Sequence, residues 1–494
     1  MGPGRDQICD LVIRGGTVVT ADGTSDGDVG ITGGLISQVG GSPRGRAELD
    51  ATGALVLPGG IDMHVHLSSP PGPDPGAAAW ADDFGSGSAA AIAGGITTIG
   101  NMTFPWPGGT LGQAVARDLE AAAAQAAVDY VLHPVLASPT PQALAELPEL
   151  AGAGHRTLKL FMISPEFEAC AAEMIEAVAT AGRLGLLTLI HCEDWALVRF
   201  AGQSLLAAGR GGLADWAASR PVLAERAAVE RAVAICEATG SPVYLVHTSS
   251  AAALDAARRG RHRGLPVFVE TRPLYLHLTS DVLTGPQGGK YIGAPPLRGP
   301  QDVQALWAGL ADGSVDTLGS DHAPWTLAEK IDPALDVTTA RQGVADLETM
   351  LPMLYSAGVG SGRISPERFA ALTSAAPARL LGLYPRKGTI AVGSDADLLV
   401  LDPRVRRTVD GAAMRSRAGY SVYDGWEVTG WPRFTVSRGE VVLADGQVLA
   451  EPGRGRWLRR EASGPDPALT PAPAQARAGR PGRSGPAEAG QRHS

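Results

Sequence analysis

The chain has 494 residues and a mass of 50.8 kDa, a size that accommodates two or three domains. Its formal net charge of −9 gives no support for a nucleic-acid partner or for a basic surface that binds membranes. The four cysteines are far apart and form no CxxC pair, which excludes a disulfide scaffold and favours a cytoplasmic location. We also expect no signal peptide and no membrane helix, since no apolar run approaches roughly 20 residues.

Residues 1–57 are predicted to form short β-strands joined by glycine turns, in runs such as CDLVIRGGTVV and ALVLPGG. From residue 58 to residue 385, short β-rich runs alternate with alanine-rich stretches of helical periodicity, such as residues 112–127, 166–182 and 224–240. Seven or eight strand–helix units favour an α/β fold of the (β/α)8 TIM-barrel type over an open sheet.

Strand character returns over residues 386–452, in GTIAVGSDADLLVLDP and WPRFTVSRGEVVLADGQVLA. Because strand-rich segments lie on both sides of one β/α core, we expect residues 1–57 and 386–452 to pack together as a small β-sandwich domain. Residues 453–494 are rich in Arg, Pro, Ala and Gly. We predict a disordered tail there, with a partner-binding arm as the alternative.

Two histidines give the first indication of chemistry. His64 and His66 are two residues apart at the end of an apolar run, in PGGIDMHVHLSS. On a strand, residues i and i+2 point to the same face, so the two imidazoles could bind one metal ion. Two surface histidines at a strand end are the alternative interpretation.

Three further residues of metal-ligand type follow later β-runs. His191 ends LLTLIH, His247 ends PVYLVH, and Asp321 follows VDTLGS. In β/α barrels the carboxyl ends of the strands meet at the face that carries the active site. Four histidines and one aspartate at equivalent strand ends are improbable as core packing, so we predict that they form a metal site.

Lys159 lies inside the apolar run RTLKLFM, where burying a charged amine is costly. Desolvation would lower its pKa and favour the neutral amine, which can add carbon dioxide to give a carbamate. Such an anion has two oxygens and could bridge two divalent cations. Periodicity alone favours a plainer interpretation, a lysine whose ammonium group reaches solvent at the strand end.

Three other residues near these motifs are weaker candidates. His322 follows Asp321 in SDHAP and is expected to orient a ligand. His133 stands at a strand end without an identifiable partner. Trp80 follows a proline-rich loop beyond His66 and either lines the pocket or anchors that loop.

The ordered motifs GGIDMHVHL, DDFGSGSAAAIAGGITTI, LKLFM, HCED, VHTSS, ETRPLYL, YIGAPPLR, GSDHAP and GTIAVGSDADLLVLDP resemble the amidohydrolase superfamily. The similarity is to its cyclic-amide branch of dihydropyrimidinases and hydantoinases, with allantoinases and dihydroorotases as cousins. It extends over residues 9 to 450. The resemblance implies a (β/α)8 barrel with a β-sandwich made from both chain ends, in agreement with the pattern of strands and helices.

The resemblance also implies two divalent cations, most often zinc, and a set of ligands. These are His64, His66 and Asp321 for the first cation, His191 and His247 for the second, and carbamylated Lys159 as the bridge. A hydroxide shared by the cations would attack the amide carbon of a small cyclic substrate. Asp321 would pass the hydroxide proton to the leaving ring nitrogen. Family precedent predicts a homodimer or homotetramer.

Three positions depart from the hydantoinase pattern of substrate contacts. Ser164 stands where the pattern has a tyrosine five residues after the bridging lysine. Ala294 replaces a serine before PPLR, and Gln342 replaces an asparagine. The Ser164 hydroxyl can donate a hydrogen bond from a shorter reach, and backbone groups at Ala294 and Gln342 remain candidates for contacting the ring amide. These departures keep allantoin hydrolysis as a competing prediction.

Single residues separate the related activities. Dihydroorotases usually carry an arginine just after the HxH motif, whereas this chain has Ser68 and Ser69. Arg272, in ETRPLYL, would either grip an anionic substituent or, as we favour, form a salt bridge with an acid of the barrel. A non-catalytic assembly protein on the same scaffold would be expected to lack metal ligands, and a ring deaminase would generally lack the bridging lysine.

Overall fold

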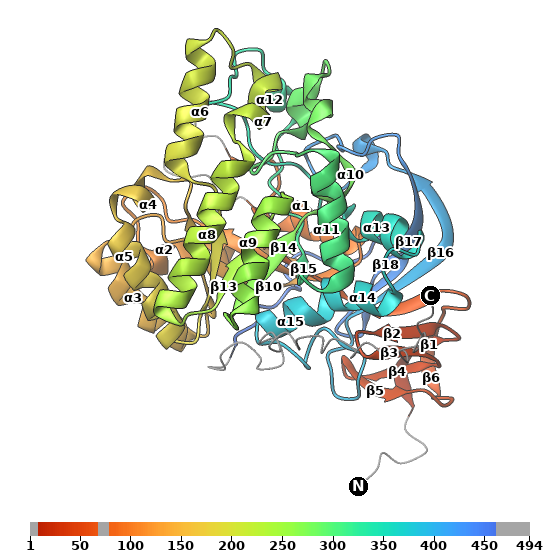
Figure 1. Cartoon of the computed structure of the whole chain (residues 1–494). Helices are drawn as coiled ribbons and strands as arrows, with labels where there is room; N and C mark the ends of the chain where they lie inside the picture. The colour runs from red at the N-terminus through yellow and green to blue at the C-terminus, as the bar shows by residue number, and fades with distance from the viewer. Residues whose placement is uncertain (1–7, 68–78, 461–494) are drawn as a thin grey trace, which may run out of the picture.

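The computed structural model describes residues 8–67 and 79–460. Most of the molecule is a core of strands covered by helices, and the strands β1 to β6 form a smaller unit at one side (Figure 1). Among the described residues, no helix has both the length and the apolar character needed to cross a bilayer.

The core contains eight strands, each parallel to its neighbours, in two sheets of order β10-β9-β8 and β11-β12-β13-β14-β15. Almost every residue in these strands is buried, as expected for strands covered on both faces. Their bounds are β8 (Gly60–Val65), β9 (Ile96–Thr103), β10 (Asp129–Pro134), β11 (Thr157–Phe161), β12 (Leu187–His191), β13 (Val243–Leu245), β14 (Val267–Thr271) and β15 (Thr317–Leu318).

The two parallel sheets also contact each other at both of their edges. Val135 forms a parallel bridge with Lys159, and Val65 forms one with His322. The amide of Leu136 donates to the carbonyl of Lys159 at 2.9 Å, and the amide of His66 donates to that of His322 at 2.7 Å. The carboxyl ends of the strands on either side of each bridge therefore lie next to each other.

Helices follow the core strands along the chain, and α8, α9 and α11 cross one side of the core in Figure 1. The predicted helices at 112–127 and 224–240 correspond to α2 and α8, whereas the one at 166–182 is divided at Cys170 into α4 and α5. The bounds are α1 (Phe84–Ala93), α2 (Leu111–Gln125), α3 (Pro141–Ala153), α4 (Pro165–Ala169), α5 (Ala171–Arg183), α6 (Trp195–Ala207), α7 (Trp216–Ser219), α8 (Val222–Thr239), α9 (Ala251–His262), α10 (Pro273–His277), α11 (Pro300–Asp312), α12 (Leu327–Lys330), α13 (Met350–Leu354), α14 (Pro366–Ala370) and α15 (Ala376–Leu380).

The two ends of the described chain share one sheet. Seven strands follow the order β19-β18-β17-β16-β7-β2-β3, and a second sheet has the order β5-β4-β1-β6. The two sheets contribute apolar side chains such as Ile31 and Val400 to one core. The bounds are β1 (Cys9–Arg14), β2 (Thr17–Thr20), β3 (Gly23–Asp26), β4 (Val29–Thr32), β5 (Leu35–Val39), β6 (Gly45–Asp50), β7 (Leu55–Pro58), β16 (Leu398–Thr408), β17 (Glu427–Ser437), β18 (Glu440–Ala444) and β19 (Gln447–Val448).

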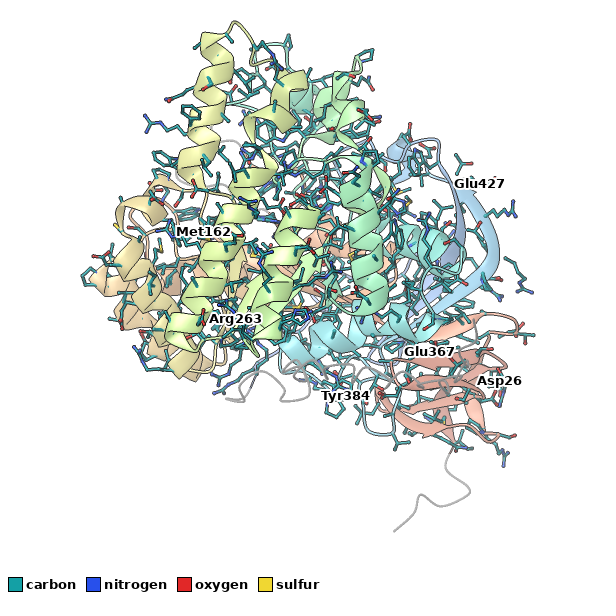
Figure 2. The ribbon with its side chains drawn as sticks, viewed as in Figure 1. Asp26, Met162, Arg263, Glu367, Tyr384 and Glu427 are labelled. Atoms are coloured by element: carbon teal, nitrogen blue, oxygen red, sulfur yellow. The ribbon has the colours of Figure 1, made fainter. Side chains whose placement is uncertain are left out.

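A buried ionic cluster ties this β-domain to the start of β10. The ammonium group of Lys387 lies 2.9 Å from Asp129 and 3.1 Å from Asp395, and it also contacts Asp397. The carboxylate oxygens are close enough to hold a metal ion, but Lys387 supplies the cation. On another side of the β-domain, the Thr24 hydroxyl donates to Glu367 of α14, which is labelled in Figure 2.

The first residues of the predicted tail are part of the folded core, which corrects the boundary placed at residue 453. The Tyr130 amide donates to the carbonyl of Arg456, and the Leu458 amide donates to that of Tyr130, both at 2.9 Å. Leu458 is 1% exposed. Apolar residues in an arginine-rich segment therefore allow it to pack beside β10. The rest of the predicted tail, residues 461–494, lies outside the described residues.

Candidate metal centre

The HxH motif lies at the end of β8, with both imidazoles buried. The Nε2 atoms of His64 and His66 are 3.3 Å apart, as the period of two in a strand predicts. A carboxylate of Asp62 on the same strand accepts from the amide of His64 at 3.0 Å and from the amide and hydroxyl of Ser320. Asp62 thus joins β8 to the segment that carries Asp321.

The proton of His64 is placed by a glutamate from a distant strand. Glu270, on β14, accepts from Nδ1 of His64 at 2.8 Å and from the Tyr244 hydroxyl at 2.7 Å. Because Nδ1 donates to the carboxylate, Nε2 carries the lone pair. Gly319 makes room for this arrangement, since a Cβ at that position would lie 2.5 Å from Glu270 Oε2.

Asp321 faces both histidines of the motif. Its Oδ1 lies 3.1 Å from His64 Nε2 and 3.0 Å from His66 Nε2. Its other oxygen, Oδ2, accepts from Arg272 at 2.9 Å. Burial alone would raise the pKa of Asp321, but Arg272 and the two imidazoles hold it well below its ordinary range. Asp321 is therefore a carboxylate with one oxygen held by Arg272.

The two remaining histidines approach from neighbouring strands. The rings of His191 and His247 have centroids 4.5 Å apart, and that of His247 is 5.4 Å from that of His64. Nε2 of His191 lies 2.8 Å from Glu193, whose carboxylate is also held by Arg220. Glu193 thereby leaves the Nδ1 lone pair of His191 free to bind a ligand.

Lys159, on β11, is fully buried in the same region. Burial lowers its pKa to about 8, although the nearby carboxylates of Asp321 and Glu270 act in the opposite direction. Its Nζ has no hydrogen-bond partner within the described part of the chain, and it lies 4.8 Å from the Phe161 ring. The ammonium group therefore does not reach solvent, which excludes the plainer interpretation of this lysine.

These side chains fit a divalent cation. Ligand atoms of His64, His247 and Asp321 all lie within 4.8 Å of one another. Nε2 of His64 and Nε2 of His66 lie 3.1 and 3.0 Å from Oδ1 of Asp321, so three potential ligand atoms face one point where a cation could be held. Imidazole and carboxylate are ligands that zinc and similar metals accept. The structure thus brings together His64, His66, His247 and Asp321, with the ring of His191 beside that of His247.

The three predicted substrate contacts differ in their structural surroundings. Ser164 caps α4, its hydroxyl oxygen accepting from the amide of Phe167 at 3.0 Å, which leaves the hydroxyl proton to donate. Ala294 lies in a turn before a cis peptide bond to Pro295. The side chain of Gln342 is exposed, and its carbonyl accepts from Trp325 Nε1 at 2.8 Å.

Aromatic side chains border the histidines and continue into a cavity. The Trp80 ring lies 4.9 Å from that of His66, and the Phe104 ring lies 5.9 Å from it. Trp80 therefore contacts the centre itself. The loop before it, with Ser68, Ser69 and 70–75, lies outside the described residues. A cavity of about 690 Å³ adjoins this border, and its lining includes Phe104, Trp106, Leu136, Phe161, Ile163 and Ser164.

Two other histidines have structural partners. His322 donates from Nε2 to Asp82 at 2.9 Å, and its carbonyl holds the amide of His66, so it supports the ligand segment from behind. His133 bonds Thr157 at 2.7 Å and the carbonyl of Met63 at 2.9 Å, which joins three strands. His133 is therefore not a ligand.

Sequence reasoning missed the acids that orient the ligands. Glu270 and Glu193 each stand near the end of a buried strand, in VFVET and HCED, and an acid in that setting could have been noticed. The partner of Glu270 is 206 residues away, so their pairing could not be predicted. Arg272 forms a salt bridge with Asp321, which is the role that we favoured from the sequence. Its side chain is fully buried and does not reach a substrate.

Comparisons with known proteins identify the family of this chain. Residues 55–442 match the model of the amidohydrolase family. The chain is 36% identical over 461 residues to D-phenylhydantoinase of Escherichia coli, covering 91% of this chain and 98% of that protein. The solved structure of D-hydantoinase from Bacillus sp. AR9 has a TM-score of 0.87 at 37% identity, covering 92% of this chain and 99% of that one.

A third similar protein is named for the L rather than the D stereoisomer of its substrate. L-hydantoinase (dihydropyrimidinase) from Arthrobacter aurescens is 32% identical, with a TM-score of 0.84, and covers 92% of this chain and 100% of that one. The matched length and identity show that the chain belongs to the amidohydrolase family.

We predict that Glu270→Gln weakens the binding of a divalent cation by about 10- to 100-fold, because the amide no longer fixes the proton of His64 on Nδ1. Competition with a chromophoric chelator measures the affinity. Glu237→Gln, at an acid whose side chain is 52% exposed, is the control and should leave the affinity unchanged. Equal affinities in all three proteins would contradict the role of Glu270.

Proposed function

We propose that the protein is a metal-dependent hydrolase that opens the amide bond of a cyclic amide such as a hydantoin or a dihydropyrimidine. The observation that carries this proposal is the convergence, at the carboxyl ends of three strands, of His64, His66, His247 and Asp321. The relatives named as hydantoinases and a dihydropyrimidinase support the substrate class. The half-buried aromatic border formed by Trp80 and Phe104 supports a substrate with a planar ring.

The finer arrangement follows from the same residues. We propose that the eight parallel strands close into a (β/α)8 barrel, which the bridges at both sheet edges support. Two cations, with zinc the best match to these donor atoms, would be held by six residues: His64, His66, Lys159, His191, His247 and Asp321. Carbamylation of Lys159 is supported by its burial, its lowered pKa and its lack of a hydrogen-bond partner within the described chain.

The residues around the proposed centre have different roles in the reaction. Divalent cations, if held by these residues, would supply a hydroxide near neutral pH and polarise the carbonyl of the substrate. Asp321, whose carboxylate is oriented by Arg272, would take up the proton of the attacking water and return it to the ring nitrogen as the amide bond breaks. Trp80 and Phe104 shield this proton transfer from bulk water. The Ser164 hydroxyl and backbone groups at Ala294 and Gln342 would hold the ring amide.

We further propose a homodimer or homotetramer. Large apolar side chains on α6 and at the start of α8 are exposed in the single chain, with Phe200 at 71%, Leu206 at 43% and Leu223 at 49%. Exposed large apolar side chains are a feature of association surfaces. A cytoplasmic location stays a prediction, supported by four free cysteines.

The proposed function is tested by a ring-opening screen with 5-phenylhydantoin, hydantoin, dihydrouracil, allantoin, dihydroorotate and simple cyclic imides. We expect the hydantoins or dihydrouracil to be opened, and metal analysis of the same protein to find bound zinc or manganese. Preferential opening of allantoin would favour the competing prediction. Metal content near zero with no turnover would favour a non-catalytic assembly protein.

We predict that Asp321→Asn retains the fold but lowers kcat by about 1000-fold or more, because it removes a proton acceptor and a ligand at once. Steady-state kinetics and circular dichroism measure the two properties. Asp22→Asn, at an exposed residue of the small domain, is the control. Near-normal turnover of Asp321→Asn would refute the role of Asp321.

We predict that Lys159→Ala loses bound metal and regains part of its metal and activity in millimolar acetate or propionate. A short carboxylate can occupy the space of the carbamate and supply two oxygens. Lys290→Ala, at a partly exposed lysine, should keep its metal. Full metal occupancy of Lys159→Ala without added acid would count against a bridging carbamate.

A further inference from the structure

A second buried lysine, Lys330, lies outside the set of proposed ligands. It is the last residue of α12 and is 1% exposed. Its Nζ donates to three backbone carbonyls, those of Ile292 at 2.5 Å, Arg341 at 2.6 Å and Gly343 at 2.8 Å. One ammonium group therefore holds two segments of chain that are about fifty residues apart in sequence.

The three hydrogen bonds indicate that Lys330 is protonated. Burial and the nearby Arg272 lower the pKa of the Lys330 amine well below its usual value. The three carbonyls act in the opposite direction, because only an ammonium ion has three protons to donate. Lys330 forms no salt bridge with an acid of the described chain, so the carbonyl dipoles alone offset the cost of burying the charge.

The segments that Lys330 joins carry two of the proposed substrate contacts. Ile292 is two residues before Ala294, and Arg341 and Gly343 are the neighbours of Gln342. The Gly343 amide also donates to the carbonyl of Ile292 at 3.1 Å, so the segments are in direct contact. Their backbone positions depend on each other and on the ammonium group between them.

Both segments also lie against the neighbours of Asp321. A Cβ on Gly293 would be 3.2 Å from Arg272 Nη1, and a Cβ on Gly343 would clash with the backbone carbonyl of Ala323. Gly343 has φ of +122°, a conformation that glycine adopts readily. A shift of either segment would therefore change the distance between the ring-binding backbone and the proposed proton acceptor.

We propose that Lys330 is a positioning residue that sets the spacing of the backbone segments 292–294 and 341–343, and with it the recognition of the ring amide. The inference rests on the proposed function, since it concerns the site that would hold the cyclic amide. Lys330 contacts neither the substrate nor the metal ligands. It acts through carbonyls close in sequence to Ala294 and Gln342, whose backbone groups are proposed to hold the ring amide.

The first test compares Lys330→Met with Lys290→Met and the unchanged protein, using the ring substrate that the unchanged protein opens fastest. Methionine is an unbranched side chain, one atom shorter than lysine, and donates no hydrogen bond. Lys330→Met should raise KM by about ten-fold or more while kcat stays within about three-fold, because ring binding is lost and the metal ligands are kept. Its metal content should equal that of the unchanged protein, and Lys290→Met should change neither constant.

The second test needs no activity. Hydrogen–deuterium exchange, followed by mass spectrometry, should be faster by about ten-fold at the backbone amides of both 292–294 and 341–344 in Lys330→Met. Lys290→Met should show the exchange of the unchanged protein. If Lys330→Met does not fold, Lys330→Gln replaces it. A glutamine can still donate two hydrogen bonds, so Lys330→Gln should raise KM and speed exchange in both segments relative to the unchanged protein, each by less than about ten-fold.

The outcomes separate this inference from the proposed function. If the unchanged protein opens none of the rings, the proposed function fails, and the exchange experiment still decides whether Lys330 joins the two segments. Unchanged exchange in both segments would overturn the inference. Unchanged KM, or a loss of metal from Lys330→Met, would overturn it as well, because the effect would then lie outside ring recognition.

Discussion

The placement of protons on buried imidazoles is the constraint on which the site depends. Glu270 holds the proton of His64 on Nδ1, and Glu193 holds that of His191 on Nε2. The lone pairs of both rings are thereby directed away from their acids. In His64 that lone pair meets the carboxylate oxygen of Asp321 at 3.1 Å. A divalent cation held at this point would take both the imidazole nitrogen and the carboxylate oxygen as ligands.

The candidate ligand side chains come from several strands, and the fold brings these strands together. Parallel strands bring their carboxyl ends together, so residues far apart in sequence become neighbours. His247 and Asp321 then leave their strands with φ of 42° and 48°. Such backbone conformations cost of the order of 1 kcal/mol each in residues other than glycine. This strain is tolerated where it directs two ligands to one point, and Asp62 holds the segment next to Asp321 in place.

The sequence was informative about the fold and the ligands because both rest on local patterns. Alternating β-rich runs and helical stretches predicted the parallel core, and polar residues at strand ends predicted five candidate ligands, of which His64, His247 and Asp321 lie close enough to hold one ion. The acids behind the ligands were missed, since the pairing of His64 with Glu270 depends on tertiary structure. The packing of 454–460 beside β10 was missed as well, because its composition resembles a tail while Leu458 fills a buried position. Lys159 needed the family resemblance, since periodicity alone favoured a solvent-reaching side chain.

A divalent cation between the HxH motif and Asp321 is the feature on which the proposed chemistry depends. Anomalous X-ray diffraction at the zinc edge, on crystals of the full chain purified with zinc and without chelators, tests it most directly. We predict an anomalous peak about 2.0–2.1 Å from Nε2 of His64 and of His66. Crystals of zinc-supplemented protein with no peak at that position would contradict it.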